Sequence, residues 1–338
     1  MDPDPREFRS LGALGIVRES LKVISSHTKL FLGLTLTLIV PLCFIGLGHN
    51  LVTEPITGRI LWDAFLSQHV HTGSDEEQTI DNDIHKQMVK LYAILAVYAV
   101  FVLAFSLLST SAVVYSVACI YSERITSCKR VLSVVPRVWK RLIVTFIWAM
   151  IMTFGYGLVF AFCFTVLAIV FGLIFPESEA AIAVLFWLGA FLFVGGSVYL
   201  SCVWHLGSVI TVLEDPYGLS AIRKSLSLIK GKRRTAITLF SVYFVLSFVI
   251  GFGFDVWVVR GESSTLGTGS RIAIGALLIG VMSLVNLLGF AVQTIFYFAC
   301  KAYHNEKIDM LELSDHLGAF LGEYVPLRSS IQLEPVEP

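Results

Sequence analysis

The segment AIRKSLSLIKGKRR, residues Ala221–Arg234, lies at the entrance to a long apolar run and has an earlier counterpart in IVRESLKVISSHTK, residues Ile16–Lys29. When the chain is shifted by 205 residues, four apolar and two polar positions coincide: Leu14, Val17, Leu21, Ile24, Arg18 and Ser20 with Leu219, Ile222, Leu226, Ile229, Arg223 and Ser225. The spacing i, i+3, i+7, i+10 keeps the apolar side chains on one face of a helix. The two segments therefore predict two basic amphipathic helices, each placed before a hydrophobic segment.

The composition of the whole chain is that of a membrane protein. Its 338 residues are 56% hydrophobic and only 15% charged, whereas soluble domains carry about 25% charged residues. Six runs are long enough, at about 20 apolar residues, to cross a hydrocarbon core of about 30 Å. They are approximately Leu30–Gly48, Met88–Val117, Leu142–Phe175, Ala180–Leu213, Thr235–Val258 and Arg271–Cys300. We therefore expect an all-α, polytopic bundle of six transmembrane helices with amphipathic helices at its cytosolic interface.

The third and fourth runs predict a helical hairpin, and Pro41 predicts a kink in the first span. Only residues 176–179, Pro-Glu-Ser-Glu, separate the third and fourth runs, so these runs are expected to form an antiparallel pair with a very short turn. Both exceed the length that one perpendicular span needs, and they must tilt, kink or protrude. Pro41 interrupts the first run and is expected to kink it.

The distribution of Lys and Arg predicts the orientation, because basic loops are retained in the cytosol. Basic residues gather in the first 29 residues and in the connections that follow the second and fourth spans. The connection from Asn50 to Gln87 is instead acidic, and we expect it to be an extracytosolic loop. Both termini are therefore predicted to be cytosolic, in a multi-pass protein of the endoplasmic reticulum, Golgi or plasma membrane.

A third, weaker copy of the basic segment suggests a repeated architecture. At an offset of 94 from the last copy, Ile125, Cys128, Leu132 and Val135 occupy the anchor positions. Pro136 is expected to bend or break this helix. The pattern predicts three units of one amphipathic helix and two spans, at about 14–117, 125–213 and 219–301, although apolar segments also resemble one another by chance. The domain organisation is a cytosolic segment 1–29, a membrane domain 30–301, and a cytosolic tail 302–338 with a helix and a disordered end.

The basic residues of the three copies are candidates for contact with lipid. A helix with one apolar and one basic face is expected to lie in the membrane interface, where each basic side chain gains about 1 kcal/mol from anionic lipid. The candidate residues are Arg18, Lys22, Arg137, Lys140, Arg223, Lys224, Lys230, Lys232 and Arg233. Alternatively, the charges only fix the topology and the apolar stripe packs on neighbouring spans.

Three stretches carry a resemblance to known families. They are LGIVRESLKVI at 14–24, CKRVLSVVPRVWKRLIVTFIW at 128–148 and VLEDPYGLSAIRKSLSLIKGKRR at 212–234. Together they resemble a family of plant six-span integral membrane proteins of undefined function, some labelled as poly(A)-binding-protein-interacting, over about residues 11–325. The last stretch is remotely similar to bacterial membrane domains that precede glycerophosphodiester phosphodiesterases. Nothing in the chain matches the phosphodiesterase domain, so that activity is not implied.

Few residues are candidates for chemistry. His205 is the one imidazole deep in a span, and Glu214 and Asp215 follow it by about two turns, so the three define a candidate polar site at the cytosolic mouth; the alternative is a structural histidine. His69, His71 and His85 lie among acidic residues, but without metal-site spacing. We expect no metal and no cofactor. The basic segments lack interleaved aromatic residues, so direct nucleic-acid binding is not expected.

Three functions are consistent with these patterns. The first is a non-enzymatic membrane protein that organises membrane lipids or a cytosolic protein partner at the cytosolic leaflet through the basic helices. The second is a carrier or channel for a lipid-like or neutral substrate, suggested by the long, glycine-bearing third and fourth spans. The third is an intramembrane enzyme centred on His205, Glu214 and Asp215.

Overall fold

The computed structural model describes residues 9–67, 75–122, 128–174, 178–261 and 267–306, and every element within these ranges is helical. The elements are α2 (Ala13–Ser26), α3 (Thr28–Leu34), η1 (Thr35–Ile39), α4 (Val40–Ser67), α5 (Asp75–Tyr121), α6 (Cys128–Ile174), α7 (Glu179–Leu213), α8 (Leu219–Ile229), α9 (Arg233–Phe254), η2 (Asp255–Arg260) and α10 (Thr268–Tyr303). The predicted all-α class is confirmed. The tail predicted at 302–338 lies almost entirely outside the described residues.

Within the described ranges, six helical segments are long and apolar enough to cross a membrane, as the hydropathy of the sequence predicts. They are Thr28–Ser67, Thr79–Tyr121, Val138–Ile174, Ala180–Leu213, Arg233–Arg260 and Thr268–Tyr303. Each contains one of the six apolar runs, or nearly all of it. The protein is therefore a multi-pass, helical membrane protein.

The helices are longer than the apolar runs, and this corrects the predicted acidic loop. Most of Asn50–Gln87 is helical, because α4 continues to Ser67 and α5 already begins at Asp75. The 47 residues of α5 correspond to about 70 Å of helix. Residues 75–87 contain no Gly or Pro, so α5 can begin before the apolar run, whereas α4 continues past the apolar run in spite of Pro55. His69 and His71 lie outside the described residues, and His85 lies within α5.

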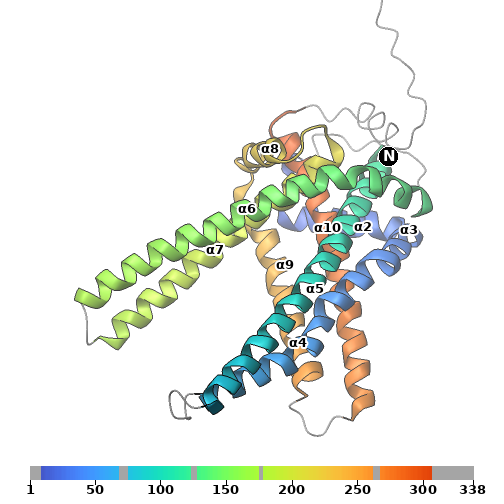
Figure 1. Ribbon diagram of the computed structural model, residues 1–338. Coiled ribbons are helices and arrows are strands. Elements are labelled where there is room, and N and C mark those ends of the chain that lie inside the picture. Colours follow the sequence, from blue (N-terminus) through green and yellow to red (C-terminus); the bar gives the residue numbers. More distant parts are fainter. Residues whose placement is uncertain (1–8, 68–74, 123–127, 175–177, 262–266, 307–338) are drawn as a thin grey trace, which may run out of the picture.

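The helices converge at one end of the molecule and diverge at the other (Figure 1). The α8 end holds the main core, to which α5 contributes Ala112–Cys119, α7 contributes Cys202–Leu213 and α10 contributes Leu287–Ala302. From this end, the α6–α7 hairpin projects away from α4, α5, α9 and α10. A small second cluster of Leu47, Phe254 and Val258 joins α4, α9 and η2 further along. Tight packing is thus concentrated where the short helices α2 and α8 lie.

The α6–α7 pair forms the hairpin that the sequence predicts, but α6 is not broken at Pro136. The helix runs without interruption from Cys128 to Ile174. Proline removes one intrahelical hydrogen bond, and long apolar helices tolerate this loss. Along the hairpin, the ring of Tyr156 stacks on Phe193 at 5.7 Å between centroids. At the start of α7, the backbone N–H of Ala181 is capped by the side chain of Ser178.

The first span contains a π-helical segment just before Pro41, where the sequence predicts a kink. η1 covers Thr35–Ile39 and ends two residues before the proline. Pro41 offers no N–H to the carbonyl of Thr37 and its ring crowds that carbonyl, which favours local widening of the helix. α4 then continues through a second proline, Pro55.

The two matching basic segments form α2 and α8, each with one buried and one exposed side. In α2 the buried residues are Ile16, Ser20 and Val23, and in α8 they are Ala221, Ile222, Ser225, Leu228 and Ile229. The matching serines are thus both buried, and the matching arginines Arg18 and Arg223 are both exposed. The predicted anchors behave differently in α2, where Leu14 is 86% and Leu21 52% exposed. α2 therefore presents leucine as well as basic side chains at the surface.

Candidate functional site

The buried side of α10, a predominantly apolar helix, carries a row of larger polar residues. They are Asn286, Gln293, Tyr297 and Lys301, and their spacing of seven, four and four residues keeps them on one face. Asn286, Gln293 and Tyr297 are all buried. Polar groups within spans persist where they have partners or a function. Hydropathy does not reveal this row, because uncharged polar residues do not interrupt an apolar run; the signal that reveals it is their helical spacing.

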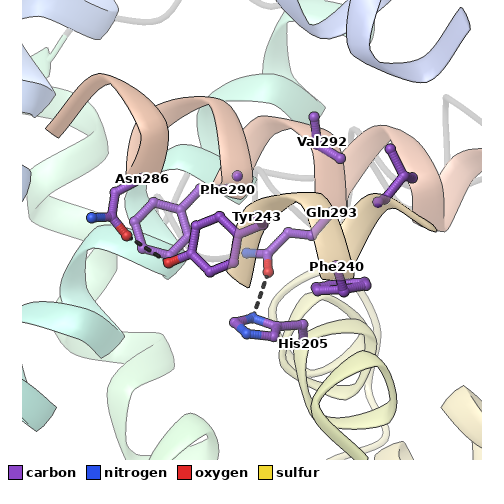
Figure 2. Close-up of a pocket in the computed structure, with 9 residues that line it drawn as sticks. His205, Phe240, Tyr243, Asn286, Phe290, Val292 and Gln293 are labelled. Atoms are coloured by element: carbon purple, nitrogen blue, oxygen red, sulfur yellow. Dashed lines mark hydrogen bonds between the residues drawn. The ribbon is translucent and has the colours of Figure 1, made fainter. Parts of the chain in front are cut away.

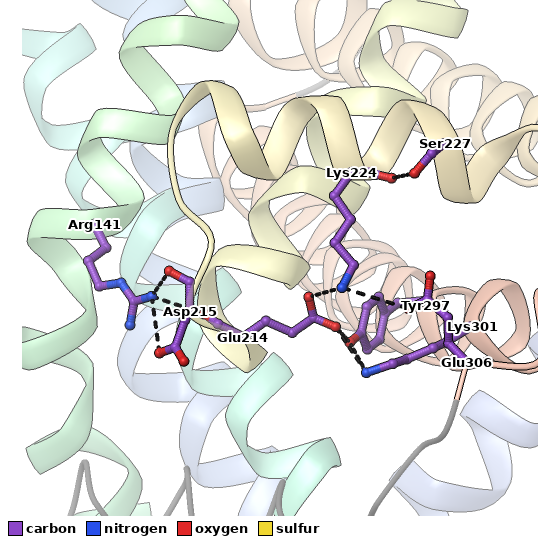
Figure 3. A network of polar contacts seen from close by, with 8 residues as sticks. All are labelled: Arg141, Glu214, Asp215, Lys224, Ser227, Tyr297, Lys301 and Glu306. Atoms are coloured by element: carbon purple, nitrogen blue, oxygen red, sulfur yellow. Dashed lines mark hydrogen bonds and ion pairs between the residues drawn. The ribbon is translucent and has the colours of Figure 1, made fainter.

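At the α8 end, the row meets Glu214, the residue that follows α7 (Figure 3). Tyr297 donates a hydrogen bond of 2.6 Å to Oε1 of Glu214, and Lys301 donates one of 3.0 Å to the same oxygen. Lys224 of α8 places its Nζ 2.7 Å from Oε2. A second carboxylate, Glu306, lies 3.7 Å from the same ammonium group. One carboxylate therefore joins α7, α8 and α10.

The charge state of Glu214 follows from these contacts. Burial raises the pKa of its carboxyl, but the contacts with Lys224, Tyr297 and Lys301 outweigh burial and lower the pKa below the ordinary value of 4.5. For Lys224, burial lowers the pKa, but the contacts with Glu214 and Glu306 outweigh it and raise the pKa. Both groups are charged at neutral pH. A carboxylate held ionised by three partners serves as an electrostatic clamp rather than as a proton donor.

Asp215 points elsewhere and is held by a different set of contacts. Its side chain is 91% exposed and lies 3.9 Å from the guanidinium of Arg141. Arg141 also donates hydrogen bonds to the backbone carbonyls of Glu214, at 3.0 Å, and of Asp215. In the same turn, the N–H of Gly218 donates a 2.7 Å hydrogen bond to the hydroxyl of Thr145. Gly218 has a φ of 62°, which favours glycine.

His205 occupies a separate site between α7, α9 and α10 (Figure 2). Its Nδ1 lies 3.0 Å from Oε1 of Gln293, and its ring stacks on Phe240 at 5.1 Å between centroids. Beside it, Tyr243 donates a 2.8 Å hydrogen bond to Oδ1 of Asn286. These side chains line a cavity of about 30 Å³, which is enough for a water molecule.

The candidate triad of the sequence analysis is therefore divided between three environments. His205 pairs with Gln293, Glu214 with Lys224, Tyr297 and Lys301, and Asp215 with Arg141. No hydrogen bond or ion pair within the described part of the chain joins the histidine to either carboxylate. An acid–base mechanism needs these groups within hydrogen-bond reach of one reacting centre.

An apolar groove runs beside the His205 cavity. It has a volume of about 340 Å³ and lies between α2, α9 and α10. Val17 of α2, Val242 and Leu246 of α9 and Leu288 of α10 are among its lining residues. The groove and the cavity share the lining residues Leu239, Tyr243, Gly289 and Val292. The two spaces are therefore adjacent.

The predicted lipid-interface residues divide into exposed and inward-facing groups. Exposed are Arg18, Lys22, Lys140, Arg223, Lys230 and Arg233. Lys224 is engaged with Glu214, and Lys232 is only 9% exposed and donates a 2.8 Å hydrogen bond to the carbonyl of Leu11. Burial lowers the pKa of Lys232. Arg137 lies in α6, but its side chain is outside the described part of the structure.

These features define a polytopic helical membrane protein with a charged clamp at its tightly packed end and an apolar groove beside a small polar cavity. The chain belongs to a family described as a domain of unknown function, DUF8558, whose family model matches residues 1–336. No curated protein and no solved structure matches the chain significantly.

Proposed function

We propose that this protein is a non-enzymatic membrane protein that organises anionic lipid at the cytosolic leaflet through α2 and α8. The observation that carries the proposal is the exposed side of α2, where Leu14 and Leu21 alternate with Arg18 and Lys22. Apolar and basic side chains on one exposed face suit the boundary between acyl chains and lipid phosphates. The positive-inside pattern of the sequence supports a cytosolic position for this end.

α8 adds further exposed basic residues at the same end of the bundle. Arg223 and Lys230 are exposed, while Ile222 and Ser225 are buried against the bundle, with the Ser225 hydroxyl donating to the carbonyl of Val203 at 2.8 Å. α8 is therefore held against the bundle. Its exposed cations can bind lipid without the entropy cost of first ordering the helix. We call the exposed residues Arg18, Lys22, Arg223, Lys230 and Arg233 the basic collar.

The proposal is tested on the full chain in nanodiscs of mixed phosphatidylserine and phosphatidylcholine. Quenching of tryptophan fluorescence by brominated forms of each lipid measures the preference for the anionic lipid. Replacing Arg18, Lys22 and Lys230 with Gln should lower this preference at least five-fold, since each cation contributes about 1 kcal/mol. The matched control replaces Arg59, Lys86 and Lys90 with Gln. These three residues are exposed on α4 and α5. Equal preferences in the two triple variants would contradict the proposal.

A second function, a carrier for a lipid-like or neutral substrate, is favoured by the apolar groove between α2, α9 and α10. An apolar recess of this size falls in the range of small-molecule sites, about 300–1,000 Å³. The test uses liposomes that contain the purified protein and a fluorescent phosphatidylcholine. Carrier activity should make the inner-leaflet probe accessible to a membrane-impermeant bleaching agent faster than in protein-free liposomes. Equal rates in both would count against this function.

A further inference from the structure

The amide of Gln293 is half paired inside the His205 cavity. The side chain is 2% exposed, its Oε1 faces Nδ1 of His205 at 3.0 Å, and its Nε2 has no hydrogen-bond partner. Since Nδ1 pairs with a carbonyl oxygen, it carries the proton and donates. The amide nitrogen is then a buried donor without a partner in the wall of the cavity. A buried donor without a partner costs about 1–3 kcal/mol, which indicates a site where an acceptor binds.

The neighbouring groove is apolar, so it can hold the hydrocarbon part of a molecule whose acceptor atom enters the cavity. Tyr243 and Gly289 line both spaces, and a side chain at Gly289 would meet the Tyr243 ring at 3.0 Å. Glycine therefore allows Tyr243 to lie close against α10 where the two spaces meet. On the outer side, Val242 and Leu246 of α9 are exposed, so the groove is accessible from the lipid-facing surface.

We propose that the groove and the His205 cavity form one site for an acyl ester of a lipid, with the chain in the groove and the ester carbonyl accepting from Nε2 of Gln293. This inference rests on the second function proposed above and names its ligand class. Neither space is lined by Asp, Glu, Lys or Arg. The group that enters is therefore uncharged, and a charged head group stays outside the groove.

The occupant has to satisfy two conditions that water alone does not meet. A water molecule fits the cavity and could accept from Gln293, but it leaves the apolar groove unoccupied. An alkyl chain alone fills the groove but offers no acceptor. An ester supplies an acceptor and a chain in one molecule, and burial of the chain contributes about 0.8 kcal/mol for each methylene group.

The inference is tested by photolabelling of the full-length protein in phosphatidylcholine nanodiscs. The probes are the methyl ester of a diazirine-bearing fatty acid and the matched diazirine-bearing hydrocarbon without an ester. Labelled residues are mapped by mass spectrometry. In the wild type, the ester should label Leu246 and Leu288 at least five-fold more than the hydrocarbon does. Gln293→Met should remove this preference, and Thr294→Val, a neighbouring buried change outside both linings, should keep it.

A second pair of variants changes exposed residues, so the buried core is left intact. Val242 and Val245 are 55% and 61% exposed on α9, but only Val242 lines the groove. Val242→Trp should reduce ester labelling of the groove at least ten-fold, and Val245→Trp should leave it unchanged. Equal labelling in the two variants, or equal labelling by the two probes in the wild type, would overturn the proposed site. Selective labelling without accelerated lipid movement would instead refute the carrier and retain the site.

Discussion

Lys224 and Glu214 face each other across the turn between α7 and α8, with 2.7 Å between the ammonium nitrogen and Oε2. Only 30% and 13% of the two side chains are exposed, so the pair is little screened by solvent. Because Lys301 of α10 contacts the other oxygen of the same carboxylate, the position of α8 is coupled to that of α10. The exposed cations of the basic collar on α8 are thereby fixed relative to the bundle.

Removing the charge of Glu214 should destabilise the protein. Glu214→Gln leaves Lys301 without its counter-charge and Lys224 with only Glu306, at 3.7 Å. Loss of one partner in a buried network costs about 3 kcal/mol. Thermal unfolding in detergent micelles, followed by circular dichroism, measures the change. The adjacent carboxylate provides the control, since Asp215 is 91% exposed and Asp215→Asn should alter stability by less than about 0.5 kcal/mol. A similar unfolding temperature for both variants would contradict the clamp.

The same carboxylate predicts an acid-sensitive contribution to stability. Its pKa in the folded protein lies below the ordinary value of 4.5, so its stabilising effect is complete above that pH and is lost as the pH falls through the folded pKa. The difference in unfolding temperature between wild type and Glu214→Gln should therefore be constant from roughly pH 5.5 to 7.5 and shrink below pH 4.5. A difference that persists unchanged into strong acid would show that ionisation of Glu214 is not its source.

The sequence predicted the six spans because an apolar run of sufficient length has few other structures available to it. The matching segments also placed α2 and α8 correctly, with their arginines exposed. Contacts between distant residues were beyond this reasoning, since His205 and Gln293 are 88 positions apart. The inward direction of Lys232 was equally hidden, because it depends on a carbonyl 221 residues away, at Leu11.

The length of the helices was underestimated for a different reason. The polar residues of Asn50–Gln87 indicate a loop, although most of them are also compatible with a helix that continues past the apolar run. The polar row on α10 was missed because Asn286, Gln293 and Tyr297 carry no charge. Helical spacing of uncharged polar residues within an apolar run is therefore the signal that would have identified this part of the candidate site.

Two adjacent glycines of α7 should respond in opposite ways to the same substitution. A Cβ at Gly196 would lie 2.1 Å from the hydroxyl oxygen of Tyr156, whereas a Cβ at Gly195 meets no atom within 4 Å. Gly196→Ala must displace Tyr156 from its 3.2 Å hydrogen bond to the carbonyl of Phe193, at a cost of about 1–3 kcal/mol. Gly195→Ala should stabilise the helix by up to about 1 kcal/mol. Thermal unfolding is compared for the two variants, and the close approach of α6 and α7 at Gly196 would be contradicted if Gly196→Ala were no less stable than Gly195→Ala.

The hydroxyl of Thr145 should be required for the turn that leads into α8. It accepts the Gly218 N–H at 2.7 Å and lies 2.9 Å from the Thr211 hydroxyl, at a fully buried position. Thr145→Val keeps the shape of the side chain but leaves the Gly218 N–H without a partner, which costs about 1–3 kcal/mol.

The Thr145→Val substitution should destabilise α8 in particular, besides lowering the stability of the whole protein, because Gly218 immediately precedes α8. Amide hydrogen exchange in residues 219–229 should therefore accelerate in Thr145→Val beyond what the drop in global stability explains. Thr153→Val is the matched control, since the Thr153 hydroxyl bonds only within α6, to the carbonyl of Ala149 at 2.8 Å. If both variants exchange alike in α8, the turn is held by Arg141 and the Glu214 clamp alone, and the hydroxyl of Thr145 has no special part in positioning the basic collar.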